Sequence, residues 1–249
     1  MQALQLIRSI IFVFLMYAAM AIMGLVYGIL SLFDKEFAFR AIRHYCLLVR
    51  WLAHYIVGLR SEIRGPVPEG ELLIASKHQS FFDILMIVSV AKRPKFIMKK
   101  EILYTPIVRF YAKAIGCIAV DRGKRGLAIK KMVEDVNNTT QPGQLIIFPQ
   151  GTRVAAGANK PYKIGTGVLY TETGQAVVPA ATNVGVFWPR HGLMRKPGLA
   201  VLEFLPTIQP GLEIDDFMTK LEVAVETGSN ALMAEAGFSP LMGNASKES

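Results

Sequence analysis

Cysteine is scarce in this chain, and the sequence also lacks internal repeats and low-complexity linkers. Cys46 and Cys117 are the only cysteines among 249 residues. They indicate neither a disulfide framework nor a cysteine-based metal site, and they are compatible with a reducing compartment. The length suits one domain with an appendage better than two full domains.

Charge is missing from a long stretch near the N-terminus. Ser9 to Phe33 contains no charged residue, and the chain as a whole is 52% hydrophobic, which is more apolar than an ordinary soluble enzyme. The stretch is long enough to cross a bilayer. A cleaved signal peptide is the alternative interpretation. We disfavour it because the apolar run is longer than a typical signal core and no small-x-small cleavage site clearly follows it.

A second helix of another kind is predicted over Glu36 to Leu59. Its basic side chains recur at helical spacing, at Arg40, Arg43, Arg50 and His54. A basic amphipathic helix usually lies in the headgroup plane, although a core-packing helix with a solvated basic face gives the same pattern. The net charge of +9 would suit nucleic acid, an anionic membrane surface or phosphorylated substrates, and the apolar excess favours the last two. We therefore predict an N-terminal two-helix membrane anchor, either spanning or half-inserted.

From about Arg60 onward, short apolar runs alternate with helical stretches. The predicted strands are Glu62–Arg64, Leu72–Ala75, Lys95–Met98, Cys117–Val120, Leu145–Phe148, Ala176–Ala180 and Ala200–Phe204. The predicted helices are Phe81–Val90, Pro106–Ala114, Leu127–Asn137, Gly165–Thr173 and Asp215–Met233. This alternation predicts an α/β domain with a mostly parallel central sheet flanked by helices. We expect the two-helix membrane segment over residues 1–59, the α/β domain over 60–236 and a flexible tail over 237–249.

His78 and Asp83 stand five residues apart, between a predicted strand and a predicted helix. A carboxylate can orient an imidazole ring, and the ring can then take a proton from a hydroxyl, which is the minimal set for general-base catalysis. The end of a strand is also a common place for active sites in α/β proteins. The structural alternative is a capping box formed by Ser80 and Asp83, with His78 as an ordinary loop residue.

Two further segments each end in an arginine that could bind an anion. They are Gly116 to Arg122 and Leu145 to Arg153, and in each the arginine follows a predicted strand. An arginine can grip a phosphate group with two parallel hydrogen bonds, which a lysine cannot. The alternatives are a solvated basic loop in which Asp121 pairs with Arg122, and a strand followed by a turn that binds no ligand.

Together these segments resemble the glycerophospholipid acyltransferase family, especially the bacterial 1-acylglycerol-3-phosphate acyltransferases. That family carries an Asn-His-Gln-Ser-x-x-Asp-like box, a Gly-x-Ile-x-x-Asp-Arg box, a Phe-Pro-Glu-Gly-Thr-Arg box and a Val-Pro-containing strand, in this order. The corresponding segments here are Lys77–Asp83, Gly116–Arg122, Phe148–Arg153 and Val177–Pro179. The resemblance covers about residues 60–210, and four boxes in order are more specific than one.

The resemblance implies a role for each matching residue. His78 would be the general base that deprotonates the acceptor hydroxyl, and Asp83 would orient it. Arg122 and Arg153 would hold the acceptor's phosphate. The other substrate-binding residues would shape the pocket or form its wall, and they are Gln150, Gly151, Thr152 and Pro179. Because the nucleophile is the substrate's own hydroxyl, the reaction needs no enzyme serine and no Gly-x-Ser-x-Gly elbow.

Two residues depart from the family pattern. Lys77 stands where the family often has Asn, and Gln150 stands where it usually has Glu. Glutamine keeps the shape and a hydrogen-bond acceptor but loses the charge, so any electrostatic help that Glu gives to a neighbouring arginine is absent. These departures bear on the identity of the acceptor more than on the type of reaction.

The resemblance implies a membrane-associated O-acyltransferase that moves a fatty acyl group from acyl-CoA or acyl carrier protein to 1-acylglycerol-3-phosphate, giving phosphatidic acid. It implies no cofactor and no metal. We expect the inner membrane, with the catalytic domain on the cytoplasmic face where the thioester donors are. The alternatives are an acyltransferase for another lysolipid, such as a lyso-ornithine lipid, and a non-catalytic lipid-binding membrane protein, against which the intact His78 and Asp83 argue. Nucleic-acid binding is disfavoured because the chain has no aromatic and basic platform.

Overall fold

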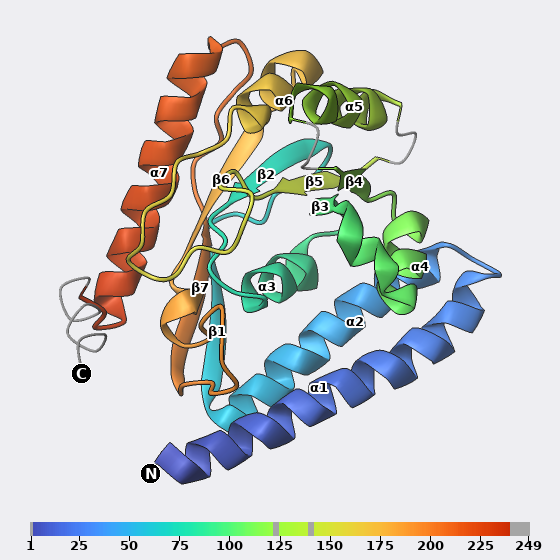
Figure 1. The fold of residues 1–249 in the computed structure, drawn as a ribbon, viewed down its shortest axis with the longest axis vertical. Coiled ribbons are helices and arrows are strands. Elements are labelled where there is room, and N and C mark those ends of the chain that lie inside the picture. The colour runs from blue at the N-terminus through green and yellow to red at the C-terminus, as the bar shows by residue number, and fades with distance from the viewer. Residues whose placement is uncertain (1, 122–124, 139–141, 240–249) are drawn as a thin grey trace.

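All seven predicted strands lie in one sheet of the computed structural model, which describes residues 2–121, 125–138 and 142–239. The strands are β1 (Leu59–Arg64), β2 (Leu72–Ser76), β3 (Pro94–Lys99), β4 (Ile118–Val120), β5 (Gln144–Ile147), β6 (Val177–Thr182) and β7 (Gly198–Phe204). Their order is β1-β7-β6-β2-β5-β3-β4, and every pairing is parallel except that of β6 with β7. The predicted α/β fold with a mostly parallel sheet is confirmed (Figure 1).

The predicted helices are also present. They are α1 (Gln2–Ser31), α2 (Glu36–Leu52), α3 (Phe82–Val90), α4 (Pro106–Ala114), α5 (Arg125–Asn137), α6 (Gly165–Thr173) and α7 (Ile214–Glu235). Pro106 opens α4, where its missing N–H costs nothing, and Gly174 closes α6 in the left-handed region at φ 59°. The helix predicted over Glu36 to Leu59 ends in a π-helical turn, η1 (Ala53–Val57). Two 3-10 turns are additional to the prediction, η2 (Lys100–Tyr104) and η4 (Val184–Val186).

The two faces of the sheet are covered by different helices (Figure 1). Ile74 and Ile146 belong to the core that α1, α2 and α3 cover, whereas Leu73 and Leu145 belong to the core under α5, α6 and α7. Successive side chains of a strand point to opposite faces, so a strand that is covered on both faces is apolar throughout. This explains why β2 and β5 are short aliphatic runs without alternation.

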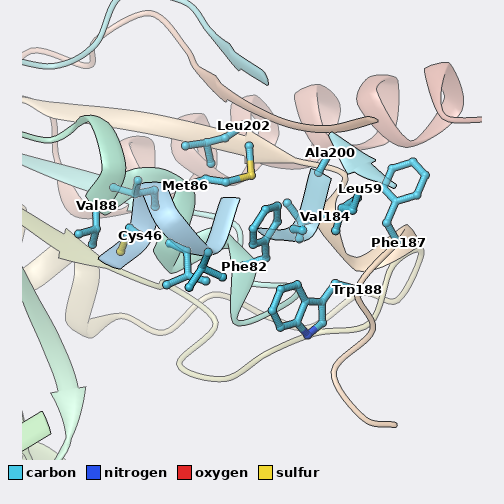
Figure 2. Packing of buried hydrophobic residues seen from close by; sticks show 14 of the residues in the cluster. Cys46, Leu59, Phe82, Met86, Val88, Val184, Phe187, Trp188, Ala200 and Leu202 are labelled. Carbon is cyan, nitrogen blue, oxygen red and sulfur yellow. The ribbon is translucent and has the colours of Figure 1, made fainter. Parts of the chain in front are cut away.

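An aromatic group joins α1 to the first of these cores. Phe82, at the start of α3, stacks on Trp188 with ring centroids 5.2 Å apart, and Figure 2 shows both rings among the buried residues around Val184. Phe12 of α1 meets the same Trp188 edge-on at 5.4 Å and is fully buried. Burial of such a ring stabilises the fold by about 1.5–3 kcal/mol, so α1 is part of the folded core.

α1 also contacts the rest of the chain through hydrogen bonds at two widely separated points. Near its start, Gln5 Nε2 donates to the backbone oxygen of Val57 at 2.9 Å. Much further along, the backbone oxygen of Gly24 accepts a hydrogen bond from the Tyr111 hydroxyl at 2.9 Å. Gly24 permits this approach because an added Cβ would lie only 3.0 Å from Cγ2 of Ile107 on α4. The helix therefore lies along the domain and does not project away from it.

The other side of α1 is apolar and exposed. Phe14 is 69% exposed and Leu25 is 68% exposed. Among the described helices, α1 is the one that is long and apolar enough to cross a membrane, judged by length and composition. Exposed apolar side chains in such a number indicate a surface that contacts something other than water.

The basic face predicted for α2 is only partly exposed. Arg40 and Arg43 are exposed. Arg50 instead turns inward, where it donates to Ser61 Oγ at 2.8 Å and to Ser89 Oγ at 2.7 Å, and burial lowers the pKa of its guanidinium. The prediction that Arg50 belongs to a basic face in the headgroup plane is therefore wrong, because Ser61 of β1 and Ser89 of α3 bind it inside the domain.

The domain limits predicted from the sequence stay predictions. β1 begins at Leu59, next to the boundary expected after residue 59. At the other end of the domain, the backbone N–H of Gly237 donates to Ala234 O at 2.9 Å and so closes α7. Most of the predicted tail, residues 240–249, lies outside the described residues.

Candidate active site

His78 lies in the short loop between β2 and α3 and is hydrogen-bonded to Asp83. Its Nδ1 is 3.1 Å from Asp83 Oδ2, and Asp83 is fully buried. The same oxygen accepts hydrogen bonds of 2.7 Å from the backbone N–H groups of Gln79 and Ser80. One carboxylate therefore binds the loop backbone at the start of α3 and also orients the imidazole. The helix-capping and the catalytic interpretations of Asp83 are compatible.

The tautomer of His78 follows from this contact. A carboxylate can only accept, so the hydrogen lies on Nδ1 and the neutral ring keeps its lone pair on Nε2. The ring stacks on Phe148 with centroids 4.0 Å apart and an interplanar angle of 20°. The backbone oxygen of His78 also accepts a hydrogen bond from Val154 N at 2.7 Å. The loop after β2 and the loop after β5 thus hold the imidazole between them, with its side chain 13% exposed.

A cavity of about 920 Å³ extends from His78. At the same end it is lined by Gly151, Thr152 and Arg153, which follow β5. Elsewhere its walls are mostly apolar side chains from α1, α2, α3, α4, α5 and β3, among them Met20, Met23, Ile42, Ile84, Phe96, Ile107 and Met132. Such a cavity favours hydrocarbon over water, and its reactive end carries the polar groups.

The polar end of the cavity is basic. Arg153 and Lys163 both line it. Gly151 adopts a left-handed backbone at φ 67°, which glycine accepts without strain, and the end of the Lys163 side chain lies close to it. Arg153 reaches the backbone oxygen of Arg190 at 3.5 Å through Nη1. These cations, together with the N-terminus of α6, favour an anion at this end.

The predicted residue Arg122 lies outside the described residues. Its neighbour Asp121 is described, and its Oδ2 lies 2.7 Å from Nζ of Lys100. The role of Arg122 as a phosphate ligand therefore stays a prediction that rests on the resemblance of its segment to the acyltransferase box.

Gln150 and Pro179 are not among the residues that line this cavity. Gln150 is almost completely buried, and its Nε2 donates to Lys160 O and to Glu226 Oε1, each at 3.3 Å. Pro179 lies within β6 opposite Ala75 of β2. Gln150 points towards α7, and Pro179 is buried within β6. Their binding of substrate stays a prediction.

Two features near the site could not be assigned from the sequence. Lys163 lines the cavity beside Arg153, although ten residues separate them. Glu226 of α7 meets Gln150 from a part of the chain with no recognisable motif. Lys163 precedes a predicted helix after an arginine-containing turn, which is a weak signal for an anion site. Glu226 offers no sequence signal, because only the packing of α7 on β6 brings it there.

The fold and the site define a class: an α/β protein that presents an oriented His–Asp pair at the end of a central strand, beside a long apolar cavity with a basic end. Within that class, the chain belongs to the acyltransferase family, whose model matches residues 59–183. The four ordered boxes predicted this family, and both the family and the enzyme class are confirmed.

Individual relatives agree with this assignment. The chain is 29% identical over 244 residues to the 1-acyl-sn-glycerol-3-phosphate acyltransferase of Pseudomonas aeruginosa, which covers 94% of this chain and 93% of that protein. It is also 29% identical over 172 residues to the mouse 1-acyl-sn-glycerol-3-phosphate acyltransferase alpha, which covers 66% of this chain and 60% of that protein. The crystal structure of the 1-acyl-sn-glycerophosphate (LPA) acyltransferase PlsC from Thermotoga maritima superposes with a TM-score of 0.76 at 18% identity, covering 94% of this chain and 99% of that one. At this identity the superposition shows a shared fold.

Proposed function

We propose that this protein transfers a fatty acyl group from the thioester of coenzyme A or acyl carrier protein to the free hydroxyl of 1-acylglycerol-3-phosphate, giving phosphatidic acid. The observation that carries the proposal is His78, oriented by Asp83 at 3.1 Å, beside a cavity with a basic end and apolar walls. The Pseudomonas and mouse relatives are 1-acyl-sn-glycerol-3-phosphate acyltransferases, which supports the same acceptor.

In the proposed reaction, His78 Nε2 takes the proton of the acceptor hydroxyl as that oxygen attacks the thioester carbonyl. The carbon–oxygen bond forms, and the carbonyl oxygen carries the negative charge of the tetrahedral intermediate. When the intermediate collapses, the carbon–sulfur bond breaks and the leaving thiolate takes the proton from the imidazolium. Asp83 stabilises the imidazolium between these two steps without itself being protonated.

The two ends of the cavity suit the two parts of such lipids. The phosphate of the acceptor would bind Arg153 and Lys163 at the basic end, because charge-assisted hydrogen bonds to phosphate are the strongest ones available there. An acyl chain would fill the apolar part that runs towards α1, where each buried methylene contributes about 0.8 kcal/mol. His78 lies at the basic end, against the loop that carries Arg153, so the hydroxyl and the thioester carbonyl would meet there.

Membrane association is the second part of the proposal. α1 contacts the domain at both Gln5 and Gly24, so a helix standing upright across the bilayer would draw the charged domain in with it. We infer that α1 lies in the plane of the membrane surface, with the side that carries Phe14 and Leu25 in the acyl region. Because both donors are cytosolic, the domain would face the cytoplasm at the inner membrane.

The test is product analysis with purified full-length protein. Labelled acyl-CoA and acyl carrier protein thioesters are each supplied with lysophosphatidic acid, a lyso-ornithine lipid or another lysophospholipid, and the products are separated by thin-layer chromatography. We expect phosphatidic acid to form with by far the highest kcat/KM. A higher kcat/KM for the lyso-ornithine lipid would show that this lipid is the acceptor. If no lysolipid were acylated, the proposal would be overturned.

A further inference from the structure

A buried polar cluster lies behind the candidate active site, on the side of α7. Lys77 is only 1% exposed, and its Nζ lies 2.6 Å from both Oε1 and Oε2 of Glu226. Oε1 of Glu226 also accepts hydrogen bonds from the Tyr162 hydroxyl at 3.0 Å and from Gln150 Nε2 at 3.3 Å. Burial raises the pKa of Tyr162, and the Glu226 carboxylate raises it further, so the phenol stays protonated and donates.

The three partners of Glu226 come from the loops that form the site. Lys77 directly precedes His78, and the two side chains point to opposite sides of the chain, towards Glu226 and Asp83, as successive residues of an extended segment do. Gln150 lies three residues before Arg153, and Tyr162 directly precedes Lys163. One carboxylate on α7 therefore contacts the neighbours of His78, Arg153 and Lys163, while Glu226 itself is not among the cavity-lining residues.

The helix that supplies this carboxylate is firmly placed. Phe217, Leu221 and Val225 of α7 are fully buried in the core over β2, β5 and β6. A side chain fixed to such a helix can hold a loop in one position, whereas loops alone carry the lowest local stability. The two departures from the family pattern, Lys77 and Gln150, both bind this carboxylate, so they belong to one cluster.

We propose that Glu226 is a positioning residue for acyl transfer: it fixes the His78 loop through Lys77 and fixes the Arg153 loop through Gln150 and Tyr162. The cluster holds one ammonium, one carboxylate and a neutral amide, so its charges balance. Buried charges are tolerated only when they are paired in this way. This inference rests on the proposed function for its kinetic consequences, although the contacts themselves do not depend on the substrate.

The negative charge of the cluster can be moved from position 226 to position 150 while the net charge stays the same. This exchange is the basis of the test. Glu226→Gln leaves the Lys77 ammonium buried without a counter-charge. Gln150→Glu places a second carboxylate next to Glu226. Gln150 and Glu226 form one hydrogen bond, and the double variant Gln150→Glu/Glu226→Gln exchanges the amide and the carboxylate between them. The cluster then again holds one carboxylate to pair with Lys77. The matched control is Asp216→Asn, which removes a carboxylate from α7 at an exposed position near the start of the helix.

For each single variant we expect kcat to fall about 10- to 100-fold and the acceptor KM to rise, because a displacement of about 1 Å at a catalytic group has such effects. The donor KM should stay the same. The double variant should recover most of the lost kcat, and Asp216→Asn should resemble the parent. A lower unfolding temperature with unchanged kcat for the folded protein would mean that Glu226 is only structural, and additive losses in the double variant would also overturn the proposal. If Glu226→Gln does not fold, Gln150→Glu and the double variant make the same comparison.

A second readout does not need the substrate. Diethyl pyrocarbonate modifies accessible neutral histidines, and peptide mass spectrometry reports the rate at His78 separately. We expect this rate to change severalfold in Glu226→Gln and Gln150→Glu and to return towards the parent value in the double variant. If the parent makes no phosphatidic acid but these rates behave as expected, the proposed function fails and the positioning role stands. Equal rates in all variants would overturn the positioning role, whatever the substrate.

Discussion

The two faces of the central sheet are built for different tasks. On one face, α7 packs on a dense core in which Tyr170 and Phe217 stack with ring centroids 3.9 Å apart. The helices α1, α2 and α4 of the other face line a cavity of about 920 Å³, which Ile129 and Met132 of α5 also reach, and α1 turns apolar side chains outward. The two long helices at opposite ends of the chain show the contrast: α7 buries its apolar residues, whereas α1 exposes many of its own.

This difference shows where the chain can accept a lipid and where it cannot. A core packed like that under α7 has no room for a hydrocarbon chain, since protein interiors are close-packed. The face under α1 combines a preformed apolar space with an apolar outer surface. Changes on the α7 face should therefore alter stability, and changes on the α1 face should alter lipid binding, selectivity and membrane contact.

The largest effect is expected on the outer surface of α1. Replacing Phe14 and Leu25 together by Glu should lower binding to phospholipid vesicles at least about 100-fold, because each such side chain that leaves water contributes about 1.5–3 kcal/mol. Sedimentation with vesicles measures the binding. Val223→Glu is the control, since Val223 is an exposed apolar residue of α7. If the α1 double variant and Val223→Glu bound vesicles equally well, the outer surface of α1 would not be the part of the protein that contacts the membrane.

On the α7 face, the expected loss is in stability. Phe217 is fully buried and stacks on Tyr170, so Phe217→Ala should lower the free energy of unfolding by about 3–5 kcal/mol. Denaturant unfolding in detergent measures it. The order of preference among acyl donors should not change in the folded fraction. Val223→Ala on the exposed side of the same helix should stay within about 0.5 kcal/mol of the parent. A changed donor preference in Phe217→Ala would contradict the division of tasks.

At the junction between the faces, His78→Ala should separate chemistry from folding. We expect kcat to fall at least about 100-fold, the usual scale for the loss of a general base. Unfolding should be little affected, because the side chain lies at the edge of the cavity. Circular dichroism and gel filtration check the fold, and single-turnover assays check the chemistry. Near-normal turnover by well-folded His78→Ala protein would exclude the proposed mechanism.

The sequence predicted the fold well because local signals and burial agree in this chain. β2 and β5 are short aliphatic runs without alternation, which identifies strands covered on both faces. Pro106 and Gly174 mark the start of α4 and the end of α6, and both helix limits are predicted without error. The contact between His78 and Asp83 is also local, since a loop and the first turn of a helix supply both residues.

Contacts between distant segments were beyond the sequence. Arg50 has the spacing of a headgroup ligand, but its partners on β1 and α3 decide its orientation. Gln150 follows a strand towards the site, yet its side chain turns to α7 because Glu226 lies there. The partner of a polar or charged side chain can be identified only when the tertiary fold is known. The structure was therefore needed to assign the polar residues around the site.

A smaller effect is expected at the basic end of the cavity. Arg153→Ala should raise the KM for the lysolipid acceptor about 10- to 100-fold, because hydrogen bonds to charged groups contribute about 1.5–3 kcal/mol. The donor KM should change little, since the lost contact is remote from the thioester. Lys160→Ala is the control, a cation of the same loop that does not line the cavity. Arg122→Ala should behave like Arg153→Ala. An increase in the donor KM alone would mean that the two binding regions are reversed.

The smallest effect, and the most specific for the α1 face, concerns the length of the acyl chain. Met23 lines the cavity, whereas its neighbour Ile22 is 65% exposed on the outer side of α1. Met23→Trp should shorten the apolar space and lower kcat/KM for long donors by about fourfold for each methylene that no longer fits, at about 0.8 kcal/mol per methylene. Short donors should be used as before. Ile22→Trp adds the same ring one residue away but outside the cavity, so it should leave the chain-length profile unchanged. If both variants shift the profile alike, the preference for chain length is set at the membrane surface and the cavity does not hold the acyl chain. A shift in Met23→Trp alone would locate the chain beneath α1, on the face that the comparison assigns to lipid.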